Sequence, residues 1–180
     1  MQRAVSVVML VIAAAACAAG CGDDGTSAAE KWARAVCAEQ QSYQGRVGRL
    51  ADESERTRQA NPNDLTAQRQ ALLTLLDGAV AETAKALERL DGIGAPDVDG
   101  GAAAQDALVG RYESARSIFG AARAAAQAAP TDDPAAFMVA VTAVAESIGA
   151  AFAQQSGSLR DVATSAELEQ ALAGEPTCGG

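Results

Sequence analysis

The sequence predicts an all-α fold, an up-down-up-down four-helix bundle with a short C-terminal helix. Hydrophobic residues make up 49% of the chain but aromatic residues only 3%, so the apolar share depends on Ala, the best helix former. Apolar residues recur every three or four positions in four long segments, as one face of a helix requires. Short turns join these segments, which favours antiparallel neighbours.

The first two predicted helices run from Ser27 to about Ala60 and from Leu65 to about Leu90. Between them, the segment 61–64 reads Asn-Pro-Asn-Asp, a turn that ends on Asn63 or Asp64 as the helix cap. We expect the core side of the first helix to comprise Trp32, Val36, Tyr43, Val47 and Leu50, with Gln40 interrupting it. For the second helix we expect Leu72, Leu76, Val80, Ala84, Leu87 and Leu90.

The third and fourth helices are predicted from about Ala102 to Ala128 and from Pro134 to about Gln155, with Asp132 or Asp133 capping the latter. A shorter helix should cover about Ser165 to Leu172, and Thr164 and Glu167 have the spacing of a capping box. The expected core side of the third helix is Leu108, Tyr112, Ala115, Phe119, Ala122 and Ala126. That of the fourth is Phe137, Val141, Val144, Ile148 and Phe152.

The N-terminus has the build of a secretory signal. Arg3 gives it a positive start, and residues 4–19 are apolar and uncharged before polarity begins at Asp23. An uncleaved membrane helix is the alternative, although the run is shorter than the ~20 residues that span a bilayer. Within this segment, Ala18-Ala19-Gly20-Cys21 resembles the lipobox of bacterial lipoproteins, with Ala18 where Leu is usual.

The lipobox resemblance implies that the Cys21 thiol carries a diacylglyceryl group and that a peptidase cuts just before it. Residues 1–20 would then be a signal peptide, residues 21–28 a lipidated tether and residues 29–180 the helical domain. Ala14-Ala15-Ala16-Cys17 is a second candidate site, but Cys17 still lies inside the apolar run. Acyl chains contribute ~0.8 kcal/mol per buried CH₂, so we expect them to hold the protein on the cell membrane. Because a secretory signal exports the chain, the expected side is the extracytoplasmic face.

The leader removes Cys17 and the lipid takes Cys21, which leaves Cys37 and Cys178. An exported chain enters a compartment in which disulfides form, so these two cysteines can pair. A bridge between them would close a loop of about 140 residues, a stabilisation on the order of 5 kcal/mol in the chain-entropy model. The alternatives are two free thiols or a metal pair. The chain has no histidine, and two cysteines alone make a poor zinc site, so the sequence favours the disulfide.

Composition argues against several functions. A net charge of −9 is unsuited to nucleic acid, which is bound by Lys and Arg. The absence of histidine removes the commonest general base and metal ligand. Tyr43 and Tyr112, which could ligate haem, lie on predicted core stripes. Residues 97–101, Asp-Val-Asp-Gly-Gly, start like a calcium loop but lack its later ligands. We therefore predict no catalytic residue, no metal and no cofactor.

The region after the leader resembles the uncharacterised Ala-rich small lipoproteins of high-GC actinobacteria. The resemblance rests on three segments, which are Lys31-Trp32-Ala33-Arg34-Ala35-Val36-Cys37, Gly94-Ala95-Pro96-Asp97 and Glu175-Pro176-Thr177-Cys178. It implies a helical bundle with paired terminal cysteines and no known activity.

Two hypotheses of function follow. The first is a non-catalytic envelope protein whose helices bind or scaffold a protein partner near the membrane. The second is a carrier of a lipid or another small hydrophobic ligand, held in a groove where Ala-lined helices splay. An apolar cavity large enough for a ligand would be required for the second.

Overall fold

The computed structural model describes residues 26–178, apart from the side chains of residues 154–156. This part of the chain is helical throughout and holds no strand. The elements in order are α1 (Ala28–Ala60), α2 (Leu65–Ile93), α3 (Gly101–Ala128), α4 (Pro134–Ser156), η1 (Leu159–Val162), α5 (Ala166–Gly174) and η2 (Pro176–Cys178). The leader, Cys17 and Cys21 lie outside the described residues.

Side chains that accept backbone hydrogen bonds determine where the helices begin. Ser27 and Glu30 form a capping box at α1, in which each side chain accepts the other residue's backbone N–H. Asp64 caps α2 by accepting the Ala67 N–H at 2.9 Å. Asp133 caps α4, directly before Pro134 at the first helical position. At both turns the cap is therefore the second of the two residues predicted.

One predicted cap is wrong. The residue that caps α5 is Ser165, whose hydroxyl accepts the Leu168 N–H. Thr164 instead donates its hydroxyl to the Gly100 carbonyl oxygen at 2.7 Å. Capping-box spacing fits many Ser and Thr residues, and here the tertiary contact with the start of α3 takes the Thr164 side chain away.

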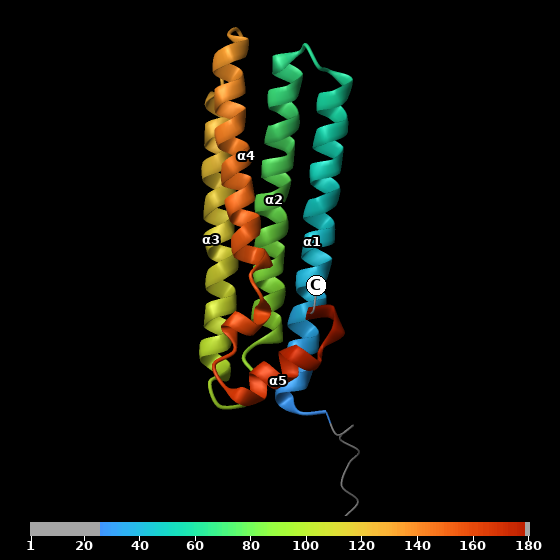
Figure 1. Cartoon of the computed structure of the whole chain (residues 1–180), viewed down its shortest axis with the longest axis vertical. Helices are drawn as coiled ribbons and strands as arrows, with labels where there is room; N and C mark the ends of the chain where they lie inside the picture. The colour runs from blue at the N-terminus through green and yellow to red at the C-terminus, as the bar shows by residue number, and fades with distance from the viewer. Residues whose placement is uncertain (1–25, 179–180) are drawn as a thin grey trace, which may run out of the picture.

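Each long helix packs along the one before it, α2 on α1, α3 on α2 and α4 on α3. Within residues 26–178, however, α1 and α4 make almost no backbone contact. α4 has 23 residues and α1 has 33, so α4 ends partway along the molecule. Figure 1 shows the chain then turning beneath the helices, where α5 packs against the lower part of α1.

The core confirms most of the predicted stripes. All six residues expected on α3 are buried, as are Trp32, Val36, Tyr43 and Val47 on α1. Tyr43 meets Tyr112 edge-to-face with ring centroids 5.2 Å apart, and Phe119 meets Phe152 at 6.0 Å. These few aromatic pairs join helices whose other core residues are mainly Ala, Leu and Val.

The stripe predicted for α2 is confirmed in part, since Leu72, Leu76 and Leu90 are buried. Val80, Ala84 and Leu87 are only half-buried, while the fully covered face of the helix passes through Ala79, Thr83 and Ala86. On this face the Tyr43 and Thr83 hydroxyl groups form a hydrogen bond between α1 and α2. Val80 and Leu87 lie at the edges of the interface instead. Leu50, Ile148 and Phe152 on the neighbouring helices are likewise half-buried rather than buried.

α4 is unusually apolar on its outer side. In the described part of the chain it is the one helix long and apolar enough to cross a membrane, with a mean hydropathy of 1.8 over Pro134–Ala153 and 22% of that stretch buried. Phe137, Val144 and Ala151 are buried in the core. Met138 and Val139, by contrast, are 57% and 73% exposed. α4 is therefore a bundle helix with an uncovered apolar surface.

Candidate binding groove

The predicted pair Cys37 and Cys178 is joined as a disulfide, with the two Cα atoms 5.1 Å apart. Cys37 is fully buried on α1, and Cys178 belongs to η2 at the end of the described chain. The bond holds α5 and η2 against α1, next to Trp32 in the same core cluster. The predicted disulfide is thus present, and its role is structural. The predicted lipid site, Cys21, lies beyond the described residues.

A groove of about 490 Å³ lies where α1 and α4 do not meet. Leu72 and Leu75 of α2 contribute to its lining, as do residues of both flanking helices. The two flanking segments run from Ala51 to Arg58 and from Val141 to Ile148, each ~10 Å long at 1.5 Å per residue. The groove is therefore open to solvent, two helical turns long and apolar where α2 lines it.

The α4 wall of the groove carries no charge. It is formed by Val141, Thr142, Ala145 and Ile148. Met138 precedes Val141 by three residues and Thr142 by four, so it continues the same stripe along the helix. Since Met is unbranched and adaptable, an exposed Met at the end of an apolar groove suits contact with varied side chains.

The α1 wall is polar. Asp52, Ser54, Glu55 and Arg58 line it together with Ala51. Arg58 donates to Glu55 at 3.1 Å, and the buried Ser54 hydroxyl donates to the Ala71 carbonyl oxygen. The Asp52 carboxylate makes no hydrogen bond or ion pair with the described residues, and only its backbone oxygen is used, by Arg56. The groove thus joins an apolar wall to a wall with an unpaired acid.

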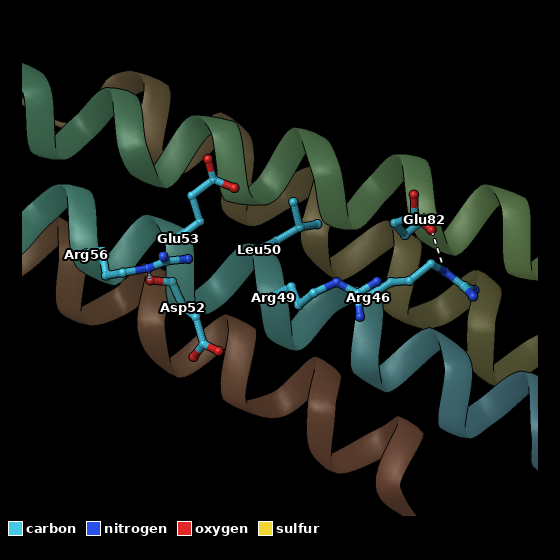
Figure 2. A pocket seen from close by; sticks show the side chains of 7 residues that line it. All are labelled: Arg46, Arg49, Leu50, Asp52, Glu53, Arg56 and Glu82. Atoms are coloured by element: carbon cyan, nitrogen blue, oxygen red, sulfur yellow. Dashed lines mark hydrogen bonds and ion pairs between the residues drawn. The ribbon is translucent and has the colours of Figure 1, made fainter.

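A second surface pocket, of about 400 Å³, lies over the α1–α2 pair and is lined mainly by charged residues. In Figure 2, Glu82 reaches from α2 toward Arg46 on α1, and Leu50 points at α2 beside them. The Arg46 Nε and Glu82 Oε2 atoms lie 2.6 Å apart, and Arg46 also pairs with Glu39 at 2.7 Å. Arg46 and Glu82 therefore neutralise each other across α1 and α2. Asp52 lines this pocket as well as the groove.

The same network extends along α2. Lys85 pairs with Glu82 at 2.8 Å and Arg89 with Glu39 at 3.1 Å. The hydrogen bond from Lys85, together with the nearby Arg46 guanidinium, lowers the pKa of the Glu82 carboxyl. The spacing of Glu82 and Lys85 predicts their contact, whereas the contacts between helices depend on the packing of α1 against α2.

Several buried polar side chains were not identified from the sequence. The Trp32 indole N–H donates to the Gln105 side-chain oxygen at 3.0 Å, and the Gln105 amide donates to the Leu90 carbonyl oxygen at 2.7 Å. Gln105 precedes the core residue Leu108 by three positions, the one signal that could have placed it inside. Burial raises the pKa of the Tyr112 hydroxyl. These groups bind the helices to one another.

Residues 26–178 contain no group of three or more acidic or cysteine side chains that could hold a metal ion. The α1–α4 groove, of about 490 Å³, combines an apolar α4 wall with the unpaired Asp52 carboxylate. Comparisons of the chain with protein-family models, with curated proteins and with solved structures found no match.

Proposed function

We propose that the protein is a membrane-anchored lipoprotein of the cell envelope whose helices form an up-down-up-down bundle without catalytic activity and bind a protein partner. The observation that carries this proposal is the groove between α1 and α4, where the fourth helix does not close the bundle. An open groove with an apolar lining from α2 and α4 and a polar side on α1 resembles the core and rim of protein interfaces. The lipid anchor on Cys21 would keep this groove near the membrane.

Affinity purification from crosslinked membranes tests this proposal. A stoichiometric protein partner should be recovered with the unaltered chain. Ala145→Glu places a charge inside the groove, and we expect it to lower recovery at least about tenfold, the effect of losing 1.4 kcal/mol. Val139→Glu adds the same charge to an exposed position of α4 outside the groove and should not change recovery. Recovery of the lipoprotein alone would contradict the proposal.

A carrier of a small hydrophobic ligand or lipid is the second candidate. The groove volume of about 490 Å³ falls within the range of ~300–1,000 Å³ that ligand pockets occupy. Such pockets bury most of their ligand, however, and this groove is open along one side, which favours the protein partner. Native mass spectrometry of the purified chain would show a bound ligand as excess mass that Ala145→Glu removes.

A further inference from the structure

We propose that the occupant of the α1–α4 groove is an amphipathic helix of the partner, with an apolar face toward α2 and α4 and a Lys or Arg beside Asp52. This inference rests on the proposed function and adds the chemistry of the partner. Its grounds are the dimensions of the groove, the distribution of charge over its walls and the missing contact between α1 and α4.

The dimensions match a helix laid lengthwise. Both flanking segments span two helical turns, and Met138 extends the α4 side by one more. A docked helix presents side chains at i, i+3 or i+4, and i+7 over that distance. Leu75, Val141 and Ile148 supply apolar contacts for those side chains. A docked helix would also take the place beside α1 that α4 leaves open.

Charge determines which side of the docked helix faces α1. The α4 wall has no ionisable group, and Arg58 on the α1 wall is already paired with Glu55. Asp52 remains as an exposed carboxylate with no partner among the described residues. Because the chain carries a net charge of −9, an approaching basic segment is attracted at long range and an acidic one is repelled.

A photo-crosslinking experiment in the cells that produce the protein tests this inference. A small diazirine amino acid is placed at Ala145, inside the groove, and in a parallel chain at Ala150, an exposed position of the same helix that does not line it. The crosslinked peptides are mapped by mass spectrometry. We expect Ala145, and not Ala150, to label a partner segment with apolar residues at helical spacing and a flanking Lys or Arg.

Asp52→Asn provides the test of charge. It should lower the yield of crosslink from Ala145 by roughly three- to tenfold, as loss of a contact of about 1 kcal/mol does. Glu113→Gln removes one negative charge from an exposed position of α3, which contributes nothing to the groove, and should leave the yield unchanged. An equal loss from both variants would show general attraction and would overturn the specific role of Asp52.

The outcomes separate this inference from the function on which it rests. A partner segment that is acidic or lacks helical spacing of apolar residues would refute the inference but leave partner binding intact. A crosslink to a second copy of this chain, or to lipid, would also refute it. If neither position captures a protein and affinity purification recovers none, the proposed function fails as well.

Discussion

Gly101, the first residue of α3, packs directly against Pro96 in the preceding loop. A Cβ atom at this position would overlap the Pro96 carbonyl oxygen, a backbone atom that cannot move aside cheaply. We therefore expect Gly101→Ala to lower the free energy of unfolding by about 2–3 kcal/mol, as overpacking does. Urea denaturation followed by circular dichroism would measure the loss.

Gly120 is the matched control for that substitution. It lies in the same helix, is exposed, and has open space where a Cβ would go. Gly120→Ala should therefore stabilise the protein by up to ~1 kcal/mol through helix propensity. Equal effects of the two substitutions would contradict the close approach of Gly101 to Pro96.

Gln105 connects three helices, because it accepts from Trp32 on α1 and donates to the Leu90 carbonyl oxygen at the end of α2. Gln105→Leu leaves the buried Trp32 indole N–H without its partner, at a cost of about 1–3 kcal/mol. The Leu90 carbonyl oxygen loses one of its two hydrogen bonds and keeps the one from the Gly94 N–H. Urea denaturation followed by circular dichroism measures the change in every variant, including one without Trp32, the only tryptophan. Trp32→Phe in the same chain should recover part of the loss, and strict additivity of the two substitutions would refute the contact.

At the scale of elements, the disulfide holds the C-terminal segment on α1. Cys37 and Cys178 are 141 residues apart in sequence, and closing so long a loop stabilises the fold by roughly 5 kcal/mol in the chain-entropy model. Cys178→Ser should therefore lower the unfolding midpoint and increase hydrogen exchange in α5 more than in α3. Reductant should reproduce the effect in the unaltered chain and change nothing further in the variant.

The ion-pair network between α1 and α2 should make their contact sensitive to pH. The Glu82 carboxyl has a lowered pKa in the folded chain, so its contribution is complete above the unfolded pKa of about 4.3. It is lost as the pH falls through the folded pKa. Glu82→Gln should cost about 0.5–1 kcal/mol at pH 7 and progressively less as the pH falls below the unfolded pKa.

Glu88→Gln is the control for this pH dependence, since Glu88 is an exposed residue of α2 without an ion pair. Denaturation midpoints of both variants over the pH range would show the difference. A Glu82→Gln variant that loses the same stability at pH 3 as at pH 7 would show that the carboxylate charge plays no part.

For the whole molecule, the anchor and the groove together define the proposed role. If Cys21 carries the lipid, Cys21→Ser should release the protein from the membrane fraction into the medium. The variant lacks the acyl chains, and these are what would hold the protein on the membrane. Cys17→Ser should remain in the membrane fraction. The opposite pattern would move the cleavage site to Cys17, and retention of both would indicate an uncleaved membrane helix.

The sequence by itself determined the number of long helices, their ends and most of their buried faces. These features depend on local physics, since helix propensity, caps such as Asp64 and the spacing of apolar residues act within a few turns. The sequence also predicted the pairing of Cys37 with Cys178, because the other two cysteines belong to the predicted leader and lipid site. The prediction was wrong for Val80, Ala84 and Leu87 of α2, where apolar character alone could not show that the buried face runs through Ala79, Thr83 and Ala86, with Thr83 bonded to Tyr43.

Only the tertiary structure showed that α1 and α4 make almost no backbone contact and leave a groove between them. Apolar spacing in both helices predicted a four-helix bundle, but the groove separates residues 51–58 of α1 from residues 141–148 of α4. The ion pairs of Glu39, Arg46 and Glu82 likewise depend on how α1 lies on α2. Such contacts join residues far apart in sequence, and no local pattern encodes the distance between two helices.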